Sequence, residues 1–137
     1  MGAEAAKSKN VVRSFHDLDA WKACRTVRQA IFALAQRLPK EERYRLADQM
    51  IRASRSAAAN LAEGYGRYHY LETIQFCRQT RGSLYELLDH LTTALECRYM
   101  SDKMFREQEQ QVLDAIRLVN GFVRYLHTRR KGASATS

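Results

Sequence analysis

The chain has 137 residues, which is enough for one domain with a core that needs neither disulfides nor a metal ion. One proline and six glycines are too few turn residues for a β-sandwich or barrel, where turns recur about every 8–12 residues. The formal net charge is +8, and no stretch approaches the roughly 20 consecutive apolar residues of a membrane span. We therefore expect a small all-α protein.

Most of the net positive charge lies at the two ends of the chain. We predict a flexible basic N-terminal arm over 1–14, a helical bundle over 15–128 and a basic, small-residue tail over 129–137. The cations of the two ends are Lys7, Lys9, Arg13, Arg129, Arg130 and Lys131. Such arms can bind nucleic acid, and they can also merely keep a protein soluble.

The first predicted helix covers 17–38. Asp17 suits its N-cap, because a carboxylate there can accept the free N–H groups of the first turn. Apolar residues then recur at spacings of three and four: Leu18, Trp21, Cys24, Val27, Ile31, Leu34 and Leu38. Pro39 ends this helix and suits the first turn of the next one.

The second predicted helix covers 41–63 and ends at Gly64. Its main apolar face is Leu46, Met50, Ala53, Ala57 and Leu61, and a second flank follows in Ala47, Ile51, Ala58 and Ala62. A bundle helix needs only one apolar stripe, so we expect this helix to be buried twice, in its own bundle and against another subunit. An alanine-rich helix chosen for propensity is the alternative.

Two further helices are predicted over 70–98 and 102–128, the last one capped by Ser101. Short connections between long helices imply antiparallel neighbours. The predicted fold is an antiparallel, up-down-up-down four-helix bundle. A coiled-coil rod is disfavoured because Pro39 and Gly64 interrupt any long heptad pattern.

Catalytic signatures are missing from the sequence. There is no phosphate-binding loop, dinucleotide-binding glycine pattern, nucleophile elbow or zinc-protease motif. The histidines are isolated, and Glu86 and His90 are four residues apart instead of the three of a di-metal bundle. We expect no metal, no cofactor and no enzymatic activity. The cysteines, Cys24, Cys77 and Cys97, are interpreted as reduced thiols of a cytoplasmic protein.

Polar residues at helical spacing suggest a network. Arg52, Ser56, Asn60 and Glu63 lie along one side of the second helix. Ser83 and Glu86 follow Gly82 in the third helix, where a glycine indicates close packing against another helix. The structural interpretation is a hydrogen-bonded network or subunit interface, and the functional one is a ligand-binding or catalytic strip.

The connection between the second and third helices is rich in aromatic and basic residues. Tyr65, Arg67 and Tyr68 could stack on bases and contact phosphate. The same side chains could simply cover the end of the bundle.

Taken together, these segments resemble the four-helix bundle family named after the 23S rRNA intervening-sequence proteins. The matching segments are 15–21, 38–44, 49–56, 60–64 with Gly66 and Arg67, and 82–86. Departures from the family pattern fall at Ala20, Thr73 and the pair Gln79 and Thr80, and they concern local packing. The resemblance implies an antiparallel bundle with no catalytic residues to assign.

The family is also similar to the accessory proteins of diversity-generating retroelements, which are basic homopentamers that bind nucleic acid and a reverse transcriptase. This similarity implies a homo-oligomer, with five subunits expected. Our leading hypothesis is a non-enzymatic oligomer that binds RNA or DNA through Tyr65, Arg67, Tyr68, Arg129, Arg130 and Lys131. The alternative is a protein-interaction scaffold or accessory subunit without nucleic-acid contact.

Overall fold

The computed structural model describes the backbone of residues 12–136 and the side chains of residues 12–129. Its elements are a 3-10 turn η1 (Phe15–Asp17), helix α2 (Asp19–Ala35), a 3-10 turn η2 (Lys40–Glu42) and helices α3 (Leu46–Tyr65), α4 (Tyr70–Glu96) and α5 (Asp102–Thr136). No strand occurs in the described part of the chain. The predicted all-α four-helix bundle is confirmed.

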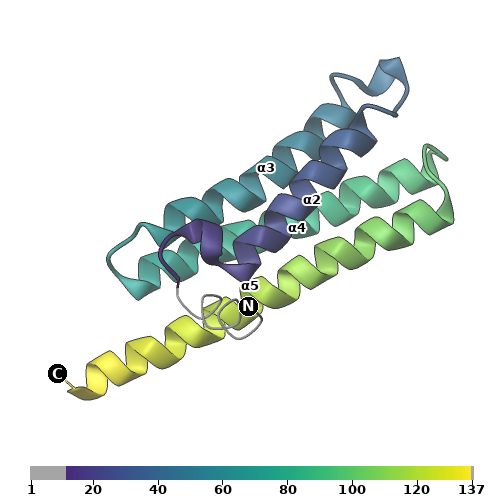
Figure 1. Cartoon of the computed structure of the whole chain (residues 1–137). Helices are drawn as coiled ribbons and strands as arrows, with labels where there is room; N and C mark the ends of the chain where they lie inside the picture. Colours follow the sequence, from purple (N-terminus) through teal and green to yellow (C-terminus); the bar gives the residue numbers. More distant parts are fainter. Residues whose placement is uncertain (1–11, 137) are drawn as a thin grey trace, which may run out of the picture.

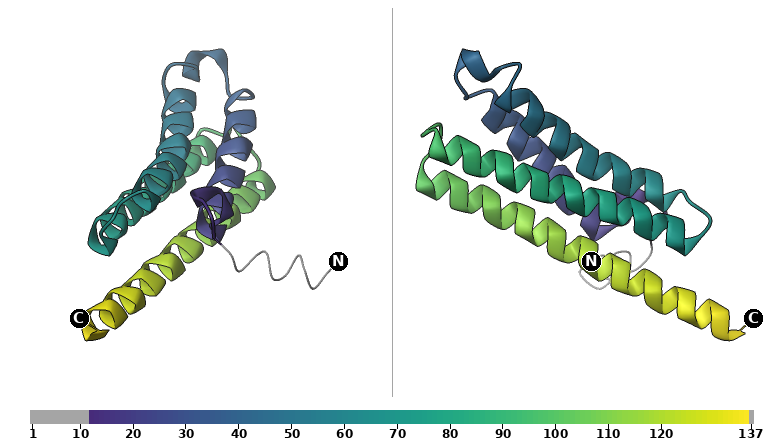
Figure 2. Two further views of the ribbon diagram at one scale, coloured as in Figure 1. Left: turned by 60° about the vertical axis from the view of Figure 1, so that its left-hand side comes forward. Right: turned by 180° about the vertical axis from the view of Figure 1, so that it is seen from behind.

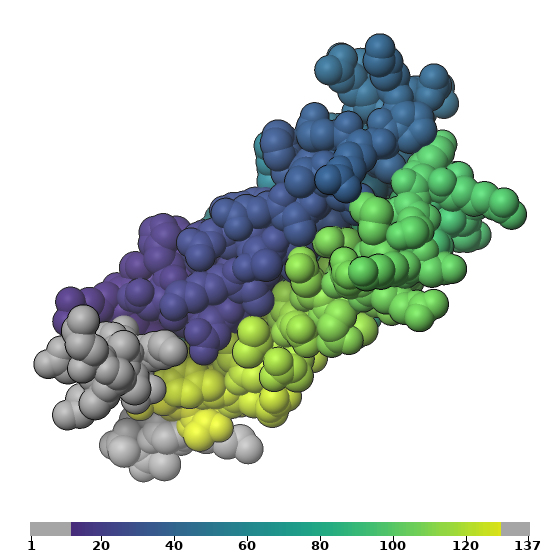
Figure 3. Space-filling model, turned by 45° about the vertical axis from the view of Figure 1, so that its right-hand side comes forward, coloured from purple at the N-terminus to yellow at the C-terminus, as the bar shows by residue number. Residues whose placement is uncertain are grey.

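The four long helices lie side by side along one common direction, and the chain turns back at each connection (Figure 1). Each helix packs on the next one in the chain, and α2 also packs on α5, which closes the bundle. Figure 3 shows α2 and α5 side by side on one face of the molecule. All four helices supply fully buried side chains to one core, among them Ile31, Met50, Leu61, Leu84, Leu91, Val112 and Val119.

The start of α2 differs from the prediction. Asp17 lies in η1, and its carboxylate accepts hydrogen bonds from the N–H groups of Arg13 (2.9 Å) and Ser14 (3.3 Å), not from α2. The Arg13 N–H bond is the main reason that the pKa of Asp17 lies below its ordinary value. The turn places Phe15 5.2 Å from the Trp21 ring, edge to face. The capping carboxylate therefore stabilises the turn that precedes the helix.

Helix α3 begins at Leu46, later than predicted, because the residues after Pro39 form the separate turn η2. Arg45 has non-helical backbone angles, φ −121° and ψ −106°, and therefore separates the turn η2 from helix α3. Glu42 accepts a hydrogen bond from the hydroxyl of Tyr99 at 2.8 Å. This bond joins the α2–α3 and α4–α5 connections at one end of the bundle.

The second apolar flank of α3 is covered within the single chain. Ala47 and Ala58 are buried, and Ile51 and Ala62 pack against the core at its margin. The expectation that this flank needs another subunit is therefore not supported. The close contact of α3 with α4 is made by another side of the helix, which carries Ala57 and Gly64.

Hydroxyl groups of α4 bond to the backbone of α3 along this contact. Thr73 Oγ1 donates to the carbonyl of Gly64 at 2.9 Å, and Thr80 Oγ1 donates to the carbonyl of Ala57 at 2.8 Å. Thr73 and Thr80 are buried, at 4% and 0% exposure. Two departures from the family pattern are thus hydrogen-bonded parts of a close helix–helix contact.

Two glycines behave differently from the prediction. Gly64 does not end α3 but lies buried within it, and a Cβ at this position would stand 2.5 Å from Cβ of Phe76. Gly82, predicted to allow close packing, is exposed, and a Cβ there would meet nothing within 4 Å. The glycine required by close approach is therefore Gly64.

The last two helices begin at the predicted residues, 70 and 102, but their C-terminal ends differ from the prediction. Helix α4 ends at Glu96, because Arg98 adopts a left-handed φ of 61° and the Tyr99 N–H bonds to the Ala94 carbonyl at 2.9 Å. Helix α5 continues past the predicted end at 128 to Thr136. Most of the expected N-terminal arm, residues 1–11, lies outside the described residues.

Candidate functional site

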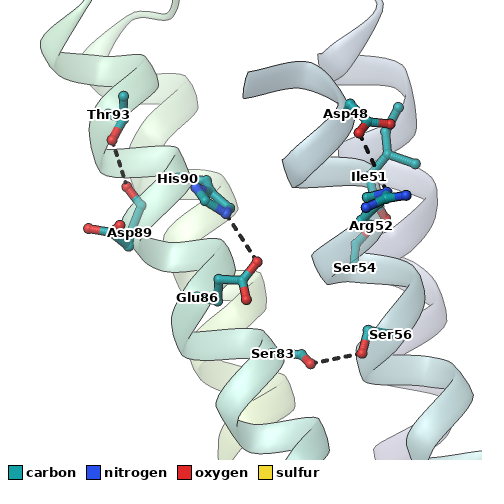
Figure 4. A network of polar contacts seen from close by, with 10 residues as sticks. All are labelled: Asp48, Ile51, Arg52, Ser54, Ser56, Ser83, Glu86, Asp89, His90 and Thr93. Atoms are coloured by element: carbon teal, nitrogen blue, oxygen red, sulfur yellow. Dashed lines mark hydrogen bonds and ion pairs between the residues drawn. The ribbon is translucent and has the colours of Figure 1, made fainter. Parts of the chain in front are cut away.

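A polar groove lies between α3 and α4, where the sequence predicts a network. Ser83 Oγ donates to Ser56 Oγ at 3.0 Å across the two helices (Figure 4). Asn60 Nδ2 donates to the same hydroxyl at 3.0 Å and to the Ser56 carbonyl at 2.9 Å. The groove has a volume of about 400 Å³ and is lined by Gln49, Arg52, Ala53, Ser56, Ser83, Glu86 and His90.

The remaining predicted members of the network bond elsewhere. Arg52 pairs with Asp48 at 3.5 Å along α3, and its side chain is 80% exposed. Glu63 pairs with Arg67 at 3.1 Å. The structure therefore brings Ser56, Asn60 and Ser83 together, leaves Arg52 at the rim of the groove and places Glu63 outside it.

His90 also lines the groove, and in the sequence it was considered only as a metal ligand. Its Nε2 lies 3.1 Å from Glu86 Oε2, and both side chains point from α4 towards α3 in Figure 4. Within the described side chains, the Ser83 hydroxyl bonds to Ser56 and not to His90. The groove thus fixes the register of α3 against α4 without forming a nucleophile–base pair.

Two cysteines lie in the core of the bundle. Burial raises the pKa of Cys24 to about 12 and that of Cys77 to about 11. Neither thiol is therefore available as a thiolate near neutral pH. Across the described residues, no group of three His, Cys, Asp or Glu side chains is placed to hold a metal ion.

The predicted aromatic and basic connection lies at one end of the bundle. Arg67 is paired with Glu63 and also lies over the Phe76 ring, 4.8 Å from its centroid. Tyr68 is 90% exposed and stands edge-on to the ring of His69. Tyr68 is therefore fully available for stacking, whereas Arg67 already has two partners.

Tyr65 faces a second, larger cavity at the same end. This cavity of about 550 Å³ is bordered by Tyr65, Arg67 and Tyr70 and by residues of η1, α2 and α5, including Leu118, Phe122 and Tyr125. The lining is largely apolar and aromatic. Tyr65 is half-buried there, so it helps to cover the end of the bundle instead of projecting freely.

The basic C-terminal residues extend towards this same end. Figure 1 shows the α3–α4 connection and the C-terminal part of α5 at one end of the molecule. Arg129 is exposed on α5. The backbone of Arg130 and Lys131 belongs to α5, and their side chains lie outside the described part. The fold therefore places the two segments that carry the predicted nucleic-acid residues at the same end of the bundle.

Sequence analysis did not single out a set of arginines on α4 and α5. Arg81 Nη1 donates to Asn120 Oδ1 at 2.9 Å, which joins the two helices at their outer surface. Arg78, Arg117 and Arg124 lie one helical turn from this contact and are exposed. In the sequence, these arginines are marked by their position beside the apolar face of each helix. Their grouping becomes recognisable once the register of α4 against α5 is known.

The comparisons with known proteins identify a family. The family model described as 23S rRNA-intervening sequence protein matches residues 16–121. A solved structure with a similar fold is a protein of unknown function from the S23 ribosomal protein family of Bacteroides thetaiotaomicron VPI-5482, determined at 1.70 Å. It is 14% identical, with a TM-score of 0.71, and the match covers 76% of this chain and 97% of that chain.

At this identity, the structural match shows the fold alone. No curated protein matches the chain at a significant level. Within the described residues, no helix combines the length and the apolar character needed to cross a membrane.

Proposed function

Because the chain belongs to the 23S rRNA-intervening sequence protein family, we propose that it is a non-enzymatic, homo-oligomeric four-helix bundle that binds RNA or DNA through its basic surface and ends. The observation that carries this proposal is the excess of unpaired cations. The net charge is +8, and of the described arginine and lysine side chains only Arg52 and Arg67 lie within 4.0 Å of a carboxylate oxygen. Unpaired arginines suit phosphate groups, since the guanidinium fork can bind them through two hydrogen bonds.

The end of the bundle adds contacts of a second kind. Tyr68 offers an exposed ring at the α3–α4 connection, and Arg129 offers an exposed cation on α5. Stacking on an aromatic ring contributes about 1–3 kcal/mol per base and tolerates any sequence. Arg67 contributes only where phosphate displaces Glu63 from it.

The proposal includes the formation of a homo-oligomer. It also includes an antiparallel order of the four helices in each subunit. Several large apolar side chains remain about half exposed on the single chain: Phe32 at 50%, Leu71 at 51% and Tyr125 at 54%. These side chains lie on three different helices, α2, α4 and α5, and another copy that covered any of them would bury apolar surface. We propose five subunits, the number that a relation to the retroelement accessory proteins would imply.

Binding of labelled RNA and DNA to the full chain, measured by fluorescence anisotropy over a range of salt concentrations, tests the proposal. Phosphate contacts predict binding at low salt and a linear fall of log K with log salt concentration. Replacing Arg129, Arg130 and Lys131 by glutamine should reduce the slope. Absence of binding at low salt, or tight binding whose affinity does not change with salt concentration, would contradict nucleic-acid recognition. The protein-scaffold alternative would then remain.

A further inference from the structure

The outer surface between α4 and α5 carries a group of arginines held in place by one interhelical hydrogen bond. Figure 2 shows these two helices side by side in the view from behind. The Arg81–Asn120 bond of 2.9 Å lies between them and fixes which residues of α4 stand beside which residues of α5. Because Arg81 is half-buried and already bonded, it positions the surface around it.

Helical spacing places three more arginines around this bond. Arg78 precedes Arg81 by one turn on α4, while Arg117 and Arg124 lie one turn to either side of Asn120 on α5. All three are exposed. From residue 117 to residue 124 the helix rises by about 10.5 Å, which equals the rise of about three base-pair steps along a duplex axis.

The charges of this surface are not neutralised by neighbouring acids. Within the described residues, Arg78, Arg117 and Arg124 have no carboxylate oxygen within 4.0 Å. Asp114 lies further round α5 and accepts a hydrogen bond from Gln110 at 3.0 Å.

The same surface exposes apolar and aromatic groups. Tyr85 is 55% exposed and lies one turn after Arg81, and Leu113 is 40% exposed and lies one turn before Arg117. An exposed ring next to unpaired guanidinium groups is the combination that holds unpaired bases and their phosphates.

We infer that the α4–α5 surface formed by Arg78, Arg81, Tyr85, Arg117 and Arg124 is the main contact for the phosphate backbone of a nucleic acid. The inference rests on the proposed function and assigns it to the side of the bundle. Arg78, Arg117 and Arg124 contact phosphates, Arg81 positions them through Asn120, and Tyr85 stacks on a base where the strand is unpaired.

A matched pair of variants tests this assignment in the full chain. The surface variant combines Arg78→Gln, Arg117→Gln and Arg124→Gln. The control variant combines Arg37→Gln, Arg43→Gln and Arg55→Gln, which removes the same charge from exposed positions around α3, the helix diagonal to α5. Binding of single-stranded RNA and of duplex DNA is measured against salt for both variants and for the C-terminal variant described above.

The surface variant should lower the slope of log K against log salt by about 2.7 for duplex DNA, at about 0.9 per phosphate contact. Between about 50 and 200 mM salt, its affinity should then fall about 40-fold less than that of the unmodified chain. The control should keep nearly the original slope. Tyr85→Leu should weaken RNA binding more than duplex binding, because only unpaired bases can stack on the ring.

A surface variant with the original slope, together with a C-terminal variant that loses it, would overturn this assignment while leaving the proposed function intact. Equal losses in the surface and control variants would also overturn it, because they would indicate a response to net charge alone. Failure of the unmodified chain to bind either probe at low salt would overturn the proposed function itself.

Discussion

Replacing Gly64 by alanine tests the close contact between α3 and α4. An added Cβ would stand 2.5 Å from Cβ and 3.2 Å from Cγ of Phe76, and 3.4 Å from the carbonyl oxygen of Thr73. The closest atom is attached directly to the α4 backbone, so it can move away only if α4 itself shifts. Such a shift would also lengthen the 2.9 Å hydrogen bond from Thr73 Oγ1 to the Gly64 carbonyl.

The magnitude follows from two opposing effects. Overpacking costs about 1–3 kcal/mol, and the rigid neighbour places this site near the upper end. Alanine regains about 1 kcal/mol of helix propensity. We therefore expect Gly64→Ala to lower the free energy of unfolding by about 2 kcal/mol.

Gly82→Ala is the matched control, because a Cβ there meets nothing within 4 Å. It should raise the free energy of unfolding by about 0.5–1 kcal/mol through propensity alone. Urea denaturation followed by circular dichroism, at equal protein concentrations, measures both variants. A Gly64→Ala protein as stable as Gly82→Ala would refute the close contact.

Three further outcomes follow from the structure. Thr80→Val should lower the free energy of unfolding by about 1 kcal/mol in the same urea assay, since it removes a buried hydrogen bond at nearly constant volume; an unchanged midpoint would show that the bond is not formed. The hydrogen bond to Glu42 raises the pKa of Tyr99 to about 12, above the ordinary value of about 10. This bond therefore stabilises the folded protein fully below a pH of about 10, and the stabilisation is lost as the pH rises towards 12. Tyr99→Phe should therefore lower Tm at neutral pH and reduce the loss of Tm over this alkaline range, and an identical alkaline profile would contradict the bond. A thiol reagent should modify only the exposed Cys97 in the folded protein and all three cysteines after unfolding, and rapid reaction of the other two thiols in the folded state would contradict their burial.

Much of the helical architecture could be predicted from apolar periodicity and a few punctuating residues. Ser101 marks the start of α5 because the effect of a cap is local to the backbone. Pro39 was expected to end the first helix at 38, but α2 already ends at Ala35, and the residues after Pro39 form η2. The starts of α2 and α3 were less predictable. Asp17 has a side chain suited to either a turn or a helix, and only its distances to Arg13 and Ser14 show which one it caps.

The neighbour that packs on the small residues of α3 could not be predicted from the sequence. Small residues on two flanks predict close approach by some neighbour, and the pattern is the same whether that neighbour is α4 or another subunit. The burial of Ala47 and Ala58 in the single chain shows that the second flank is covered without another subunit. The contact with α4 lies on another side of α3, where Thr73 and Thr80 bond to α3 carbonyls. Such contacts depend on register, which helical periodicity does not specify.

The candidate sites were predictable to different degrees. Ser56, Asn60 and Ser83 were identified as a network because polar residues in mid-helix positions need partners. The α4–α5 arginines were not identified, since arginine beside an apolar stripe is common on any surface helix. Their grouping depends on the Arg81–Asn120 bond between residues far apart in the sequence.

The central claim, that the chain is an oligomer-forming bundle that binds nucleic acid, is tested most directly by multi-angle light scattering of the full protein with and without mixed RNA. We predict that the protein alone has a mass of at least twice the 15.9 kDa of one chain. We also predict a heavier complex with RNA at low salt, which separates when the salt concentration is raised. A mass of one chain that does not change when RNA is added at low salt would contradict it.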